Sequence, residues 1–186
     1  MIKQLNVDYN LKLIGGIIKL IRVKQWVKNT FVMAPLIFSG AFFNQSSCIQ
    51  ALLVMLLFCF ASSVVYVIND LMDVENDKKH PIKSKKRPLA SGQLKEHHAM
   101  MCIGFLILFT IYLQFKIINN YAVLVVFGYI ALNLLYTFKL KHMPVLDIFT
   151  IAIGFVLRVY SGSLAINVPI SFNAQNLCKY LTITIC

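Results

Sequence analysis

The sequence predicts an all-α protein, a polytopic bundle of transmembrane helices. Hydrophobic residues make up 59% of the 186 residues, and the mean hydropathy is +0.73. Charged residues make up only 13%, against about 25% in an average soluble domain. Long apolar stretches recur along the chain, and basic residues gather in alternate connecting segments. Together these observations predict about five membrane-spanning helices.

Five apolar stretches are candidates for these helices: roughly residues 30–43, 51–68, 99–115, 121–138 and 145–166. A helix needs about 20 residues to cross the hydrocarbon core, with about 17 as the lower limit. The last four stretches reach that limit. The first is shorter, and we expect it to gain length from the preceding "IIKLIRVKQWVK", whose basic side chains and tryptophan are typical of a membrane interface.

The distribution of Lys and Arg predicts the orientation of the bundle. Residues 1–29 hold six of them, residues 69–98 hold seven and residues 139–144 hold two. By contrast, residues 44–50 hold none and residues 116–120 hold one. Because basic residues favour the cytoplasmic side, we expect a multi-pass protein of the cell membrane whose N-terminus and 69–98 segment are cytoplasmic.

The remaining composition narrows the possible partners. The formal net charge is +11, but no Lys/Arg tract is interleaved with aromatics and glycines as in a nucleic-acid-binding arm. A positive balance on an apolar chain is typical of loops that face anionic membrane lipid, so we expect lipid and no nucleic acid as a partner. The five cysteines include no CxxC pair and indicate small buried apolar side chains rather than disulfides or a metal site.

An acidic cluster stands out at the end of the second apolar stretch, in "NDLMDVENDKKHPIKSKKRPLASG" (residues 69–92). At 100° per residue, Asp70, Asp73 and Asp77 lie within about 60° of one another on a helix, beside Asn69. Like charges at this spacing repel, and the negative end of the helix dipole disfavours them further. Such a cluster indicates a divalent cation, because hard cations such as Mg²⁺ take carboxylate oxygens together with substrate phosphates.

A basic run follows the acidic cluster directly. It comprises Lys78, Lys79, Lys83, Lys85, Lys86 and Arg87. Cations beside a metal-binding cluster at a membrane surface suit a diphosphate-bearing substrate. The positive-inside rule by itself accounts for the lysines, so that alternative stays open for them. It does not account for the spacing of the aspartates.

The same segment resembles the first aspartate-rich motif, NDxxDxxxD, of the UbiA superfamily of intramembrane prenyltransferases, with its trailing RPLxxG. Three further blocks are similar to the polyprenyl-phosphate phosphoribosyltransferase branch (decaprenyl-phosphate phosphoribosyltransferase type). They are "IRVKQWVKNTFVMAPLIFSG", "NLLYTFKLKHMPVLDIFTIAIGFVLRVYSG" and "AINVPIS". The resemblance covers roughly residues 15–171, and it makes residues 1–171 the N-terminal part of a UbiA-like transferase domain.

The resemblance implies a larger helix bundle around a cavity that opens to lipid, with Mg²⁺ and a diphosphate held by two acidic motifs. In the phosphoribosyl branch the donor is phosphoribosyl pyrophosphate and the acceptor a lipid-linked polyprenyl phosphate. In the prenylating branches an isoprenyl diphosphate alkylates an aromatic or quinone precursor. Carried onto this sequence, the catalytic and metal-binding residues are Asp70, Asp73 and Asp77. The substrate-binding residues are Asn69, Lys83, Lys86, Arg87, Lys24 and Lys28, although Lys24 and Lys28 equally suit interfacial anchors.

Charged groups inside the later stretches indicate a lined cavity independently of the resemblance. Arg158 lies deep in the fifth stretch, where a charge costs about 2.5–3.5 kcal/mol on insertion scales. Asp147 shares its helix face but lies about 16 Å away along the axis. We therefore expect Arg158 to meet an anionic substrate or a carboxylate on another helix. The polar residues Tyr129, Asn133 and Tyr136 form a similar stripe in the fourth stretch, although a structural hydrogen-bond network explains Asn133 equally well. Lys139 and Lys141 follow this stripe at the cytoplasmic edge, and with Arg158 they complete the predicted substrate-binding residues.

The sequence departs from the family pattern near its end. The second acidic motif of the family follows the fifth helix, yet Asp147 is the only acidic residue after Glu96. Residues 172–186 form a divergent tail of the kind that a frameshift or premature stop produces. We therefore expect the chain to be a truncated form, inactive by itself. A non-catalytic membrane protein or an inactive fragment is the alternative of another class.

Overall fold

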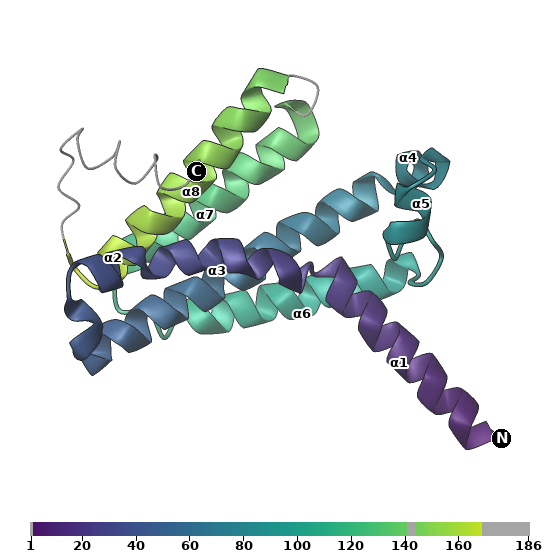
Figure 1. Cartoon of the computed structure of the whole chain (residues 1–186), viewed down its shortest axis with the longest axis horizontal. Helices are drawn as coiled ribbons and strands as arrows, with labels where there is room; N and C mark the ends of the chain where they lie inside the picture. Colours follow the sequence, from purple (N-terminus) through teal and green to yellow (C-terminus); the bar gives the residue numbers. More distant parts are fainter. Residues whose placement is uncertain (1, 141–143, 169–186) are drawn as a thin grey trace.

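The computed structural model describes residues 2–140 and 144–168, and in these ranges all regular structure is helical (Figure 1). The predicted all-α class is confirmed. The tail at 172–186 and Lys141 lie outside the described residues. The elements in chain order are α1 (Ile2–Leu20), η1 (Val23–Met33), α2 (Ala34–Phe38), η2 (Ala41–Phe43), α3 (Gln45–Met72), α4 (Val74–Lys79), α5 (Lys83–Lys86), α6 (Glu96–Gln114), α7 (Asn120–Leu135), η3 (Tyr136–Leu140) and α8 (Pro144–Ala165).

Four of the described helical segments are long and apolar enough to cross a membrane, and they correspond to the last four predicted stretches. They are Gln45–Met72, Glu96–Gln114, Asn120–Phe138 and Ile148–Ala165. Helix α3 has 28 residues and is therefore about 42 Å long, against about 30 Å for the hydrocarbon core. Its last turn can extend past the apolar layer into the interface.

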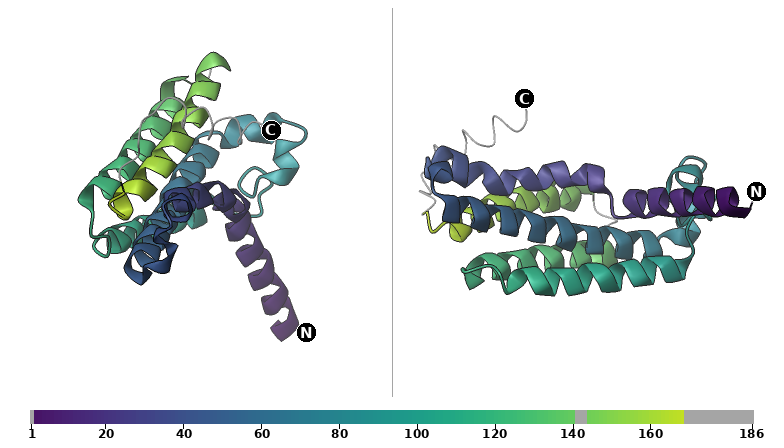
Figure 2. Two further views of the ribbon diagram at one scale, coloured as in Figure 1. Left: turned by 60° about the vertical axis from the view of Figure 1, so that its left-hand side comes forward. Right: turned by 90° about the horizontal axis from the view of Figure 1, so that it is seen from below.

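The first predicted stretch differs from a continuous α-helix. It is built from the 3₁₀-helix η1, the short helix α2 and the turn-like η2. A 3₁₀-helix rises about 2.0 Å per residue, so the 11 residues of η1 and the 5 of α2 extend about 30 Å. This extension lets a short segment run beside most of the longer α3, and Figure 2 shows η1 lying along α3.

Helix α3 is the central element, packed against η1, α6, α7 and α8. In Figure 1, α3 and α6 lie side by side, α7 and α8 form a second pair, and α4, α5 and the C-terminal end of α1 lie at one end of α3. One apolar core joins α3 to α7, and it includes Phe58 and Val126. A second core joins α3 to α1 and α6, and it includes Leu20 and Val67. This second core lies at the C-terminal end of α3, so it packs beneath the acidic segment.

Polar and small residues bring η1 close to both α3 and α8. The Trp26 indole N–H donates to Ser63 Oγ at 3.0 Å. On the other side, Gly162 of α8 approaches η1 so closely that a Cβ on it would lie 2.0 Å from the Val32 carbonyl oxygen. This close approach positions Arg158, one turn earlier on α8, beside Asn29 of η1.

Candidate functional site

The acidic segment is not one straight helix. Helix α3 ends at Met72, Asp73 caps it with φ −92° and ψ 0°, and α4 begins at Val74. On a straight helix Asp70 and Asp77 would lie about 10.5 Å apart along the axis. After this change of direction both carboxylates contact one guanidinium nitrogen. Arg87 Nη1 lies 3.0 Å from Asp70 Oδ1 and 2.5 Å from Asp77 Oδ2.

Two further cations complete this group. Arg22 Nη2 lies 2.6 Å from Asp70 Oδ1, and Lys83 Nζ lies 3.7 Å from Asp77 Oδ1. The side chains of Asp70 and Asp77 are each only 3% exposed. Their carboxylates have therefore lost most of their hydration, and the attraction of the cationic partners compensates for that loss. Arg22 was not predicted as a site residue. It occupies the left-handed turn between α1 and η1, at φ 54°, and only the fold brings it to Asp70.

The other predicted residues of this region lie around the pair. Asp73 and Asn69 are half-buried, and the backbone N–H of Asp73 donates to the Asn69 carbonyl at 3.1 Å. Lys24 and Lys86 are exposed. The Lys139 side chain, like Lys141, lies outside what the structure describes.

Glu75, the remaining carboxylate of the segment, points to solvent. Lys78 Nζ lies 2.7 Å from Glu75 Oε1, and both side chains are exposed. The hydrogen bond from Lys78 holds the pKa of the Glu75 carboxyl below its ordinary value. Glu75 is therefore a surface ion pair and stands apart from the buried aspartates, which makes it a useful control for them.

The side chains available as metal ligands decide whether this region could hold the expected Mg²⁺. In the described ranges no group of three or more His, Cys, Asp or Glu side chains is placed to hold a metal ion. Mg²⁺ in proteins takes one or two carboxylates and completes its octahedron with water and substrate phosphates. Asp70 and Asp77 face one cationic nitrogen and match that smaller requirement. The pair fits the ion provided that Arg87 turns toward a phosphate.

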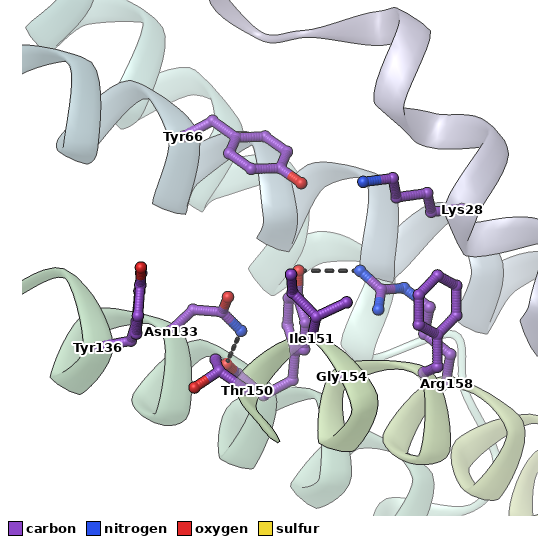
Figure 3. A pocket seen from close by; sticks show the side chains of 10 residues that line it. Lys28, Tyr66, Asn133, Tyr136, Thr150, Ile151, Gly154 and Arg158 are labelled. Atoms are coloured by element: carbon purple, nitrogen blue, oxygen red, sulfur yellow. Dashed lines mark hydrogen bonds between the residues drawn. The ribbon is translucent and has the colours of Figure 1, made fainter. Parts of the chain in front are cut away.

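A cavity of about 260 Å³ lies between η1, α3, α7 and α8 (Figure 3). Its lining residues are Lys28, Tyr66, Tyr129, Asn133, Tyr136, Thr150, Ile151, Gly154, Phe155 and Arg158. Arg158 is 5% exposed; its Nε donates to Asn29 Oδ1 at 2.8 Å and its Nη2 to Tyr129 OH at 3.0 Å. Three aromatic rings surround the guanidinium carbon at 4.8–5.8 Å: Phe58, Tyr129 and Phe155. The sequence predicted a lined cavity at Arg158 and missed Asn29.

The cavity adjoins the acidic pair. Tyr66 lines the cavity, and the guanidinium carbon of Arg22 lies 4.8 Å from the centre of its ring. Arg22 in turn binds Asp70, which follows Tyr66 by one turn of α3. Arg22 and Tyr66 therefore link the buried carboxylates to the cavity.

The model of the UbiA prenyltransferase family matches residues 31–183. The chain belongs to this family. The match includes α3 with the acidic segment and α8 with Arg158, whereas Arg22, Lys28 and Asn29 precede it. The resemblance seen in the aspartate-rich segment is confirmed.

Curated UbiA-family relatives include three proteins named decaprenyl-phosphate phosphoribosyltransferase. The chain is 42% identical to that of Corynebacterium glutamicum over 86% of this chain and 48% of the relative. It is 38% identical to that of Mycolicibacterium smegmatis and 34% identical to that of Mycobacterium tuberculosis, in each case over 86% of this chain. These matches cover 51% and 53% of the two relatives. The chain spans about half the length of the curated relatives it matches.

Proposed function

We propose that this chain carries part of the active site of a membrane-embedded, Mg²⁺-dependent transferase that moves a phosphoribosyl group from phosphoribosyl pyrophosphate to a polyprenyl phosphate. The observation that carries the proposal is the buried pair Asp70 and Asp77, which share contacts with the partly exposed Arg87. The pair adjoins a cavity lined by the buried Arg158. The names of the relatives support the phosphoribosyl branch.

Each group near the acidic pair has a chemical part in this reaction. The bond between the anomeric carbon of ribose and pyrophosphate breaks, pyrophosphate leaves with the bonding electrons, and an acceptor phosphate oxygen bonds to that carbon. Bound Mg²⁺ supplies neutralisation of the charge that builds on pyrophosphate. Asp70 and Asp77, with Asp73 and Asn69 beside them, hold the ion. Arg87 is placed to exchange its carboxylate contacts for phosphate oxygens.

The basic residues outside the pair extend the phosphate-binding surface. Lys83 already lies 3.7 Å from Asp77 Oδ1, and Lys86 and Lys24 are exposed where a soluble donor can reach them. Under the positive-inside rule this end faces the cytoplasm. Phosphoribosyl pyrophosphate would then enter from water, whereas the polyprenyl acceptor enters from lipid.

Donor binding tests the proposal directly. We expect the chain, in neutral-lipid nanodiscs, to bind phosphoribosyl pyrophosphate by calorimetry only with Mg²⁺. The Asp77→Asn substitution should weaken this binding at least about tenfold, because a charge-assisted contact contributes about 1.5–3 kcal/mol. Glu75→Gln, which removes an exposed carboxylate from the same segment, should leave the dissociation constant unchanged. Equal binding by parent and Asp77→Asn would contradict the proposal.

A prenyl transfer reaction is the second candidate, favoured by the description of the family itself. Its donor would be an isoprenyl diphosphate and its acceptor an aromatic or quinone precursor. Competition separates the two: an isoprenyl diphosphate should displace phosphoribosyl pyrophosphate poorly if the first proposal holds, and should bind in its place if the second does. A non-catalytic protein would bind neither donor, whether or not Mg²⁺ is present.

A further inference from the structure

Helix α1 exposes a row of apolar side chains, Leu11, Ile14 and Ile18. They are 62%, 52% and 49% exposed, and their spacing of three and four residues places them on one face of the helix. The other face of α1 is packed against the bundle. Leu20 on that face is fully buried in the core that joins α1 to α3 and α6. The apolar row is therefore an exposed surface on a helix whose opposite side is already held in place.

The contact made at Gly16 shows which way the apolar row faces. A Cβ on Gly16 would lie 3.1 Å from the Leu94 side chain. Leu94 belongs to the segment between α5 and α6, at the end of the bundle where the acidic segment lies (Figure 1). At 100° per residue, Ile14 and Ile18 lie about 160° around the helix from Gly16. The apolar row is therefore turned away from that end and towards the membrane-spanning part of the bundle.

The turn that follows α1 sets the direction of the helix. Arg22 lies in the left-handed region at φ 54°, and η1 begins at Val23. The chain changes direction here, and in Figure 1 α1 runs crosswise to α3 and α6. Arg22 Nη2 lies 2.6 Å from Asp70 Oδ1, which ties this turn to the C-terminal end of α3. A helix that runs crosswise at one end of the spanning helices lies along the membrane surface.

Basic side chains border the apolar row. Lys12 and Lys19 are exposed and lie about 80–100° around the helix from Leu11. Residues 11–28 contain no acidic residue and five basic ones: Lys12, Lys19, Arg22, Lys24 and Lys28. Lysines beside an apolar helix face are typical of helices that lie in the interface of an anionic membrane, where the lysines meet the lipid head groups.

We propose that α1 lies in the plane of the membrane and binds anionic phospholipid, with the apolar row among the acyl chains and Lys12 and Lys19 at the head groups. Three side chains are too few for a protein partner, since a stable interface buries about 800 Å² on each side. They suit a helix that enters the interface by one face. The inference holds for either candidate reaction. Because α1 ends two residues before Arg22, the anchored helix also holds the turn that binds Asp70.

Fluorescence quenching by phospholipid with brominated acyl chains tests the position of the row. Trp26 is the only tryptophan, so Ile18→Trp in a Trp26→Phe background reports on the row alone. We expect brominated phosphatidylglycerol to quench this reporter about as strongly as Leu108→Trp, at a 69% exposed position of the spanning helix α6. Lys85→Trp, at an exposed lysine of α5, should stay unquenched. If Trp26→Phe does not fold, the difference between Ile18→Trp and the parent chain gives the same measurement.

The choice of lipid tests the part assigned to the lysines. At equal mole fraction, brominated phosphatidylglycerol should quench Ile18→Trp at least about twofold more than brominated phosphatidylcholine, because basic residues attract anionic lipid. Adding Lys12→Gln and Lys19→Gln should abolish this preference and keep the quenching by phosphatidylcholine. Equal quenching of Ile18→Trp by the two lipids overturns the anionic-lipid assignment. An unquenched reporter overturns the whole proposal: blue-shifted emission then means that protein covers the row, and water-like emission means that solvent does.

Discussion

Replacing Gly162 with alanine should separate α8 from η1 and lower the stability of the bundle. The new Cβ would lie 2.0 Å from the Val32 carbonyl oxygen and 2.9 Å from the Val32 carbonyl carbon. These are backbone atoms, which cannot rotate away as a side chain can, so the two elements must move apart. Overpacking in a dense interior costs about 1–3 kcal/mol. We expect a clear fall in the thermal unfolding midpoint of the detergent-solubilised protein.

Gly128 provides the matched control for this substitution. It lies in α7, and a Cβ on it would meet nothing within 4 Å. Alanine favours a helix over glycine by about 1 kcal/mol, so Gly128→Ala should leave the unfolding midpoint unchanged or raise it. If both variants melt alike, the contact between α8 and η1 is not as tight as the structure has it.

The same substitution connects packing to the site. Arg158 precedes Gly162 by one turn of α8, and Asn29 precedes Val32 by one turn of η1. Moving the two elements apart therefore lengthens the 2.8 Å hydrogen bond from Arg158 Nε to Asn29 Oδ1.

Of the five spanning segments predicted from hydropathy, the last four are long and apolar enough to be recognised without their neighbours. The form of the first stretch could not be predicted in this way. Whether residues 23–33 wind as an α-helix or a 3₁₀-helix depends on contacts with distant elements. Examples are the bond from Trp26 to Ser63 and the close approach of Gly162 to Val32. A single sequence does not say which residues meet across such distances.

The candidate site shows the same limit. Helical spacing placed Asp70, Asp73 and Asp77 on one face, which is local information, but the change of direction at Asp73 and the shared contact with Arg87 are set by packing. The cost of a charge in a membrane predicted that Arg158 has partners. Its partner Asn29 lies 129 residues earlier, and nothing in the spacing points to it.

Replacing Arg87 with alanine should be strongly destabilising when no metal is present. Arg87 Nη1 bonds both Asp70 and Asp77, whose side chains are 3% exposed. Removing one partner of a buried ion pair costs about 3–5 kcal/mol; we expect about 3, since Arg87 itself remains 21% exposed. Lys78→Ala, which breaks only the exposed pair with Glu75, should leave the unfolding midpoint unchanged. A midpoint for Arg87→Ala equal to that of Lys78→Ala would contradict the role of Arg87.

Magnesium should reverse much of this loss, because a cation bound only by the folded state stabilises it by mass action. In the parent chain Mg²⁺ competes with Arg87 for the same carboxylate oxygens, whereas in Arg87→Ala those oxygens are left without that guanidinium. Millimolar Mg²⁺ should therefore raise the unfolding midpoint of Arg87→Ala more than that of the parent. The Asp77→Asn, Arg87→Ala double variant should lose this response, since one carboxylate is gone. If Mg²⁺ raises the unfolding midpoints of all three proteins equally, Asp70 and Asp77 do not hold the ion.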